Sequence, residues 1–297
     1  MSYPPVLLSI LCMLLPLPSL LCAETGDSKT GTGELSALEQ RILIERETRY
    51  QAFVITPHKP NYLLPLTYNS QPNNAPVNVA RDGALDEVEV KFQFSMKYSI
   101  AEDLFGEQGS LQFAYTNLSF WQAYNHDASS PFRETVHEPE LFFTFPYDGR
   151  FLGMTSRLIQ IGVVHQSNGR AAAQSRSWNR VYADFIFQYG DFYLSLKPWH
   201  RFEGSWAGED DNPDIETYLG KGELRLVYAS NQHTVSMLLR NNLRSPNYGA
   251  VELNWSFPMS RRVKWFFQYF DGYGESLIDY NARVQRLGIG LAFTDWL

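Results

Sequence analysis

The clearest pattern in the chain is a strict alternation of apolar and polar residues over positions 87–100, EVEVKFQFSMKYSI. Val88, Val90 and Phe92 begin an apolar row that continues at every second residue to Tyr98. Successive side chains of a β-strand point to opposite faces of the sheet. A period of two therefore predicts a strand with one apolar face and one polar face.

Further segments of similar length and pattern follow from residue 61 onward. Each is close to the roughly 9–11 residues that cross a bilayer as a tilted β-strand. Together they give about twelve predicted strands. These strands are 61–67, 87–100, 110–121, 138–147, 156–166, 179–189, 191–201, 221–229, 232–242, 248–257, 262–271 and 283–294.

The connections between these strands alternate between long and short. The long connections are 68–86, 122–137, 167–178, 203–220, 243–247 and 272–282, and the short ones are 101–109, 148–155, 190–191, 230–231 and 258–261. Outer-membrane barrels have long outer loops and short periplasmic turns. The sequence therefore predicts an all-β fold: a single transmembrane antiparallel up-and-down β-barrel of about twelve strands over residues 58–297.

The N-terminal part of the chain has a different character. Residues 1–23 are mostly apolar, and we interpret them as a secretory signal with cleavage near Ala23. The alternatives are a lipoprotein signal that uses Cys22 and a retained membrane helix, for which a run of about 18 residues with internal prolines is marginal. Residues 24–57 are predicted to be a periplasmic segment. The spacing in ELSALEQRILIERETRYQAF suits a short amphipathic helix, and a mobile lead-in is the other reading.

Composition and charge agree with a membrane barrel. Aromatic residues make up 15% of the 297 residues and charged residues only 19%, which suits a barrel with aromatic girdles at the membrane surfaces. A net charge of −7 argues against a nucleic-acid partner. Cys12 and Cys22 both precede Ala23, so cleavage there leaves a chain without thiol chemistry.

The stretch 165–180, HQSNGRAAAQSRSWNR, is a dense polar cluster between two apolar strands. The odd positions of 156–167 carry the cleaner apolar run, so we assign the odd face to lipid. His165 and Ser167 continue this row, and Asn179 begins the corresponding row of the next strand. We therefore expect three polar side chains to point outward, at the same end of the barrel.

Polar groups that face lipid without a partner cost on the order of several kcal/mol, so these three should satisfy one another. A predicted catalytic set follows, with Ser167 as the nucleophile, His165 as the general base and Asn179 as the residue that orients the imidazole. On the residues alone, a rim histidine, turn residues at Asn168–Gly169 and a strand-end cap explain the pattern equally well. The chain has no G-x-S-x-G elbow to support an α/β-hydrolase.

The same stretch resembles the active-site signature of the outer-membrane phospholipase A family. That signature is H-x-S-N-G-R, a short spacer and then S-R-S-W-N-R. The resemblance covers roughly residues 55–297. Other similar segments are HKPNYLLPLTYN (58–69), SSPFRET (129–135), EPELFFTF (138–145), LKPWHRF (196–202), DDNPDIETYLG (210–220) and GYGESLIDYN (272–281).

The resemblance implies a calcium-dependent phospholipase A1/A2 of the outer membrane, active as a homodimer on phospholipids and lysophospholipids. It also implies one calcium ion per active site, at the dimer interface. The family's calcium ligands match the Ser175 side chain and the Arg170 carbonyl of one subunit, and Ser129 of the other. Calcium prefers oxygen ligands and would stabilise the oxyanion as a Lewis acid. With no Asp or Glu cluster, we expect modest affinity.

One position departs from the family. Asn117 stands where the family has a glutamine buried in the lipid-exposed dimer seam. The shorter side chain keeps the amide, and a polar contact inside a membrane interface contributes about 1 kcal/mol or less. We therefore expect a dimer of altered strength.

Two other functions compete with a lipid hydrolase: a catalytically silent structural or transport barrel, and a secreted soluble lipase. A barrel of about twelve strands encloses a narrow interior, and a channel would place its functional residues inside. The alternation of loops disfavours a soluble lipase. Residues 272–281 are expected to stabilise a loop through hydrogen bonds. The other histidines are expected at the surface or in loops: His58, His126, His137, His200 and His233.

Overall fold

The computed structural model describes residues 36–48, 54–76, 83–104, 109–202 and 210–296. The predicted signal, residues 1–23, lies outside the described residues. The described chain is built around one β-sheet. Its strands are β1 (Thr56–Pro57), β2 (Asn61–Asn69), β3 (Val88–Asp103), β4 (Gly109–Trp121), β5 (Phe132–Phe151), β6 (Met154–Ser167), β7 (Ser177–Tyr189), β8 (Phe192–Phe202), β9 (Gly222–Ser230), β10 (His233–Asn241), β11 (Gly249–Pro258), β12 (Lys264–Tyr273) and β13 (Arg283–Thr294).

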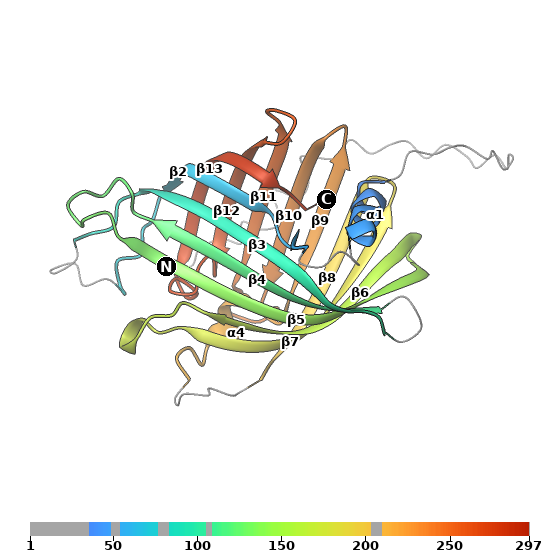
Figure 1. The fold of residues 1–297 in the computed structure, drawn as a ribbon. Helices are drawn as coiled ribbons and strands as arrows, with labels where there is room; N and C mark the ends of the chain where they lie inside the picture. Colours follow the sequence, from blue (N-terminus) through green and yellow to red (C-terminus); the bar gives the residue numbers. More distant parts are fainter. Residues whose placement is uncertain (1–35, 49–53, 77–82, 105–108, 203–209, 297) are drawn as a thin grey trace, which may run out of the picture. The chain divides into compact units, whose positions relative to one another are not determined.

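The sheet closes on itself as a barrel (Figure 1). Each strand from β2 to β12 pairs antiparallel with the next, and β13 pairs antiparallel with β2. A closed barrel has no open edge, so its backbone groups are satisfied in a bilayer. The short strand β1 adds to β3 beside Met96 and Lys97. The predicted twelve-stranded up-and-down barrel is confirmed.

Large apolar residues occupy the outward positions of the strands. In β13, Leu287, Ile289 and Phe293 are exposed, while the residues between them are mostly buried. In β6, Ile161 and Val163 are exposed in the same way. A row of exposed apolar residues on every second position is the expected lipid face of a membrane barrel. The assignment of the odd face of β6 to lipid is therefore confirmed.

Strand β5 (Phe132–Phe151) is longer than the sequence predicts, which placed it at 138–147. The outer loop before it covers 122–131 and not 122–137. Arg133 and Glu134 begin the strand with buried side chains that point into the barrel. In the sequence, charged residues before a strand are typical of a loop. Here they belong to the strand, because the barrel interior supplies their partners.

A buried network of ion pairs fills the barrel near its long loops. The Arg286 guanidinium, 1% exposed, lies 2.8 Å from Glu275 Oε2 and 2.7 Å from Glu89 Oε1. Glu275 belongs to the loop 274–282, so this network ties the loop to the strands, as the sequence predicts for residues 272–281. The other members of the network are Lys91, Arg133 and Asp279.

Replacing Arg286 with methionine is expected to lower the free energy of unfolding by about 3–5 kcal/mol, because Glu275 and Glu89 lose a buried counter-charge. Urea unfolding of the barrel in lipid vesicles measures the change. Arg283→Met on the same strand is the matched control, because Arg283 is exposed and pairs with Asp271 at the surface. Exposed pairs contribute about 1 kcal/mol or less. Equal effects of the two substitutions would contradict the role of the buried network.

Helix α1 (Ala37–Thr48) begins at a capping box. The backbone N–H of Ser36 donates to Glu39 Oε2 at 3.0 Å, and the N–H of Glu39 donates to Ser36 Oγ at 3.3 Å. This reciprocal pair satisfies orphan donors at a helix start. The sequence analysis allowed either a short helix or a mobile lead-in for this segment, and the chain forms the helix. The other short helices are η2 (Ala172–Gln174) and α4 (Ile215–Leu219).

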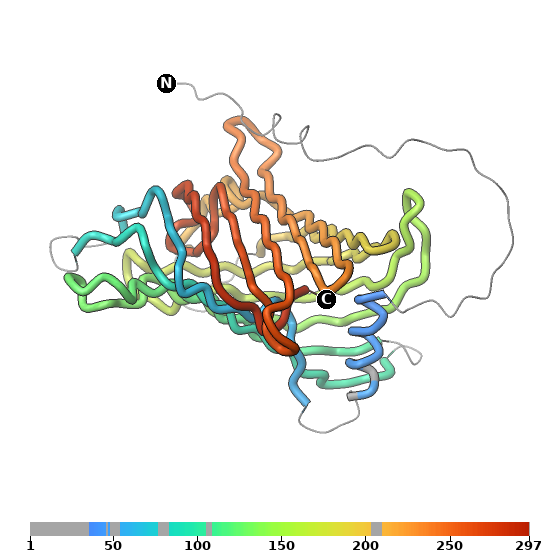
Figure 2. Tube along the Cα trace, turned by 90° about the horizontal axis from the view of Figure 1, so that it is seen from above, coloured from blue at the N-terminus to red at the C-terminus, as the bar shows by residue number. Residues whose placement is uncertain are grey.

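Helix α1 lies at the end of the barrel where the strands are joined by short turns (Figure 2). Leu38 packs against Tyr193 of β8, and Glu45 pairs with Lys97 of β3 at 2.9 Å. Contacts to strands so far apart in the sheet place the helix across this end of the barrel. Among the described residues, no helix is long and apolar enough to cross a membrane.

Candidate active site

Strands β6 and β7 place His165 and Asn179 directly opposite each other. His165 Nδ1 lies 2.8 Å from Asn179 Oδ1. His165 is exposed while Val164 and Trp178 are buried, so the pair faces away from the barrel interior. An amide oxygen accepts a hydrogen bond, so Nδ1 carries the proton and Nε2 of the neutral ring keeps a lone pair. The His165 ring therefore has one nitrogen, Nε2, that is free of a proton and can accept one.

Ser167 is the last residue of β6 and continues the outward row from His165. In the sheet it stands opposite Ser177 of β7 and His137 of β5. In the part of the chain that the structure describes, no hydrogen bond joins the Ser167 hydroxyl to the His165 ring. Residues i and i+2 of a strand share a face, and catalytic hydrogen bonds often tighten only when substrate binds. The two side chains are therefore neighbours on one face.

The buried side chain of Asn168 makes three of the hydrogen bonds within the loop 168–176. Asn168 Oδ1 accepts the backbone N–H groups of Arg170 at 3.3 Å and Arg176 at 3.0 Å. Its Nδ2 donates to the Gln174 carbonyl at 2.9 Å. Asn168 is 5% exposed, so these bonds replace water that it has lost. The side chain thus fixes the path of the loop that follows Ser167, a role that sequence reasoning missed.

Two of the predicted calcium ligands, Arg170 and Ser175, lie in this loop. The Arg170 guanidinium donates to the Phe132 carbonyl of β5 at 3.0 Å, which anchors the loop to the barrel. The Ser175 hydroxyl donates to Asp211 Oδ2 at 2.7 Å. Within the described ranges, no group of three or more His, Cys, Asp or Glu side chains is arranged to hold a metal ion. Any metal here would depend on hydroxyl, carbonyl and single carboxylate oxygens.

The third predicted calcium ligand, Ser129, lies in the loop 122–131 between β4 and β5. It is exposed, and its backbone φ of 61° is in the left-handed region. Its N–H donates to the His126 carbonyl at 3.1 Å. Between the described residues of a single chain, no hydrogen bond connects Ser129 to the loop 168–176. Within one described chain, Ser129 is therefore not hydrogen-bonded to the loop that contains the other two predicted calcium ligands.

The outer loops around the site pack on one another. The Tyr280 hydroxyl donates to Asp214 Oδ1 at 2.6 Å, and the Arg176 guanidinium stacks over the Tyr280 ring at 5.7 Å. Burial and the neighbouring Asp214 carboxylate raise the pKa of the Tyr280 phenol, so it stays a neutral donor. The loop 168–176 is thus supported from β5 on one side and from this contact on the other.

Two of the remaining histidines, His58 in the connection between β1 and β2 and His137, have partners that the sequence analysis did not predict. His58 is largely buried inside the barrel, with Nε2 3.1 Å from Glu140 Oε1 and its ring stacked on Phe142. His137 lies within β5 on the outward face, where its Nδ1 is 2.6 Å from Tyr115 Oη. His137 lies in a strand and not in the predicted loop 122–137, because β5 begins at Phe132.

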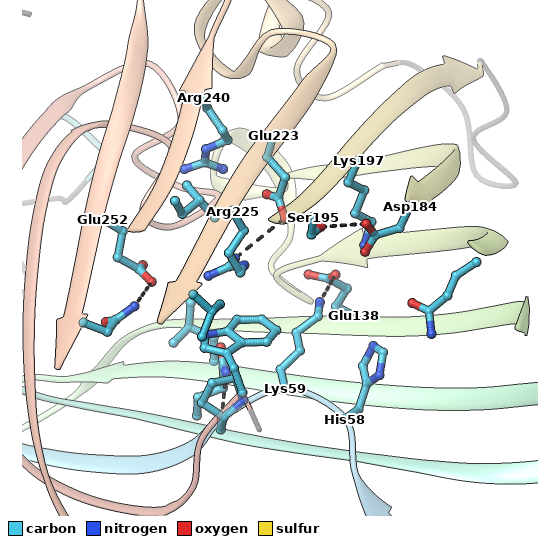
Figure 3. A pocket seen from close by; sticks show the side chains of 18 of the residues that line it. His58, Lys59, Glu138, Asp184, Ser195, Lys197, Glu223, Arg225, Arg240 and Glu252 are labelled. Carbon is cyan, nitrogen blue, oxygen red and sulfur yellow. Dashed lines mark hydrogen bonds and ion pairs between the residues drawn. The ribbon is translucent and has the colours of Figure 1, made fainter. Parts of the chain in front are cut away.

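The barrel also encloses a cavity of about 320 Å³ (Figure 3). Apolar and charged residues both line it, and the charged ones are largely paired: Lys59 Nζ lies 2.6 Å from Glu138 Oε1, and Ser195 donates to Asp184 at 2.6 Å. His165 does not line it, because the site is on the outward face of the wall. The cavity and the candidate active site are therefore separate.

A closed antiparallel barrel with an apolar outer face defines an outer-membrane barrel protein, and the outward histidine–asparagine pair gives it a candidate catalytic site. The model of the phospholipase A1 family matches residues 38–293. A relative from Neisseria meningitidis is 42% identical over 248 residues, a match that covers 80% of this chain and 65% of that protein, so the chain spans about two thirds of its length. The phospholipase A1 of Klebsiella pneumoniae is 39% identical over 246 residues, covering 82% of this chain and 83% of the relative.

A solved structure is similar over nearly the same region. It is the outer membrane phospholipase of Salmonella typhi, a dimer with bound calcium, with 36% identity and a TM-score of 0.77; the match covers 83% of this chain and 94% of that one. The chain belongs to the phospholipase A1 family, whose members are lipolytic hydrolases of the outer membrane.

Proposed function

We propose that this chain is a calcium-dependent serine hydrolase that cleaves acyl esters of phospholipids and lysophospholipids at the membrane surface. The observation that carries the proposal is the 2.8 Å contact between His165 Nδ1 and Asn179 Oδ1, on the outward face beside Ser167. A site on the outer wall of a barrel meets lipid directly, whereas a site inside would need the lipid to leave the membrane.

The residues would act in sequence on the ester. Ser167 Oγ attacks the carbonyl carbon while His165 Nε2 takes the hydroxyl proton. The bond to the glycerol oxygen then breaks, and His165 gives the proton to the leaving alkoxide. Water repeats the cycle: His165 takes its proton, the fatty acid is released and Ser167 recovers its hydrogen. Asn179 holds the ring in the tautomer that both steps need.

The donor set near Ser167 fits calcium. The Ser175 hydroxyl, the Arg170 carbonyl and the partner subunit's Ser129 would supply hard oxygen ligands, and the Asp211 carboxylate adds negative charge 2.7 Å from Ser175 Oγ. When bound, calcium would polarise the ester carbonyl and stabilise negative charge on its oxygen. The calcium bound in the similar Salmonella typhi dimer supports this part of the proposal.

The proposed active form is a homodimer. The Salmonella typhi phospholipase is a dimer, and Asn117 occupies the outward face of β4, opposite His137 and 3.0 Å from Ser119 Oγ. An amide that already has a partner within its own strand gains less from a second subunit. Because the Ser129 ligand would come from the partner subunit, a single chain would hold an incomplete calcium site. Dimer formation would then complete the site and activate the enzyme.

The calcium requirement tests the proposal. Ser129→Ala is expected to raise the calcium concentration for half-maximal activity by roughly tenfold, because one ligand oxygen is lost. Fatty-acid release from phospholipid micelles is measured over a calcium titration that starts in excess chelator. Ser260→Ala, in the turn 259–263 at the other end of the barrel, is the control. The calcium site would be contradicted if fatty-acid release were the same with and without chelator. It would also be contradicted if Ser129→Ala lost the same fraction of activity at every calcium concentration.

A further inference from the structure

The candidate nucleophile stands between two imidazoles, and the proposed function uses only one. His137 of β5 is paired in register with Ser167 of β6. Directly opposite residues of antiparallel strands have Cβ atoms about 4.5–5.5 Å apart on the same face. His165 flanks Ser167 two residues earlier in its own strand, on that same outward face. His137 is therefore a neighbour of Ser167 from the opposite side.

The hydrogen-bond partners of the two rings differ, and the difference favours opposite tautomers. Asn179 Oδ1 can only accept, so His165 carries its proton on Nδ1 and presents a lone pair at Nε2. His137 Nδ1 lies 2.6 Å from Tyr115 Oη, and a phenol is a good donor to an imidazole nitrogen. With the Tyr115 hydroxyl as the donor, the neutral His137 ring carries its proton on Nε2. One ring is arranged to take a proton and the other to donate a hydrogen bond.

The His137 donor points toward the outer rim. A Cβ atom on Gly169 would lie 3.8 Å from His137 Cδ2 and 3.9 Å from Nε2, so this edge of the ring faces the start of the loop 168–176. Gly169 follows Ser167 in the direction of the outer loops. A phospholipid whose ester is at Ser167 has its acyl chain along the apolar wall and its phosphate toward the rim. The Nε2–H group is thus on the head-group side of the ester.

We propose that His137 is a substrate-binding residue whose Nε2–H donates a hydrogen bond to a phosphate oxygen of the bound phospholipid. The inference rests on the proposed function and adds a residue that would make the site favour phospholipids over neutral esters. Tyr115 is the positioning residue, because its hydroxyl keeps the proton of His137 on the nitrogen that faces the lipid. Hydrogen bonds to charged groups are among the stronger ones, so the preference is measurable.

The test compares two substrates with the same acyl chain, a phosphatidylcholine and an uncharged monoester, in the same detergent. For each, kcat/KM is measured in the wild type, His137→Phe and His137→Gln. His137→Phe is expected to lower the phospholipid-to-monoester ratio of kcat/KM by roughly tenfold, chiefly through a higher KM for the phospholipid. The amide N–H of His137→Gln is expected to restore most of the ratio. Tyr115→Phe is expected to lower it by a smaller factor.

Each other outcome overturns the inference. An equal loss on both substrates would mean that His137 supports the chemical step or the loop and not the phosphate. A ratio that stays at the wild-type value in His137→Phe would mean that the ring does not contact the head group. Heat-dependent migration on gels confirms that each variant barrel is folded. Failure of the proposed function is separate, because it requires Ser167→Ala to keep activity on both substrates.

Discussion

Replacing Ser167 with alanine is expected to lower kcat for phospholipid hydrolysis by about 10⁴-fold or more, because the residue would supply the atom that attacks the ester. The hydroxyl is the outward group next to His165 on β6, and the alanine keeps the strand, its register and its lipid face. The barrel is expected to fold as before, since the buried interior is untouched.

The measurement is fatty-acid release under saturating calcium, with the folded state checked in the same preparation. Ser177→Ala is a matched control, because Ser177 stands directly opposite Ser167 in β7 and is not a proposed nucleophile, base or calcium ligand; its hydroxyl makes only a long contact of 3.4 Å to Asp211. It is expected to retain most of the activity. Hydrolysis that persists in Ser167→Ala, or a loss of the same size in Ser177→Ala, would remove Ser167 as the nucleophile.

The barrel could be predicted from the sequence because its two signals are local. The period of two in segments such as 87–100 reports a wall with lipid on one side, and the alternation of long and short connections reports the up-and-down path. The alternation of faces also predicts the positions of two site residues. The odd positions of β6 and β7 do face outward, so His165 and Asn179 meet. A register of one residue either way would have turned them inward.

The parts that the sequence missed depend on partners far away in the chain. The start of β5 was hidden because Arg133 and Glu134 are charged, and their place in the interior is explained only by Glu89, Asp279 and the loop 274–282. A predicted strand that begins at residue 138 leaves His137 in the preceding loop and hides its pairing with Ser167. Charged residues that alternate with apolar ones just before a predicted strand are the signal that could have extended it.

The role of Asn168 was missed for a related reason. Asn-Gly is a strong turn signal, and that signal explains the residue without any contact to the rest of the molecule. The structure adds the long-range part, because Asn168 Nδ2 also lies 3.4 Å from Glu134 Oε2 of β5. A turn residue that is buried and bonded on every side shapes the loop that carries Arg170 and Ser175.

Asn168→Asp is expected to lower kcat by about 10²-fold, the scale that a misplacement of about 1 Å near a reacting group can reach. The carboxylate keeps the acceptor for the N–H groups of Arg170 and Arg176 but loses the donor to Gln174. It also places a second carboxylate against Glu134, and like charges this close repel in a buried setting. The loop should move away from β5 and carry the groups next to Ser167 with it.

Two measurements, the calcium requirement and the denaturant midpoint, distinguish a displaced loop from an unfolded barrel. Asn168→Asp is expected to need more calcium for half-maximal activity, while the denaturant midpoint of the barrel stays close to that of the wild type, because residues 168–176 lie outside the strands. The control is Asn231→Asp, in the exposed turn between β9 and β10, which makes the same chemical change far from the site. If Asn168→Asp left kcat and the calcium requirement as they are, the loop would owe its shape to its backbone alone, and Asn168 would be only the turn residue that its sequence suggests.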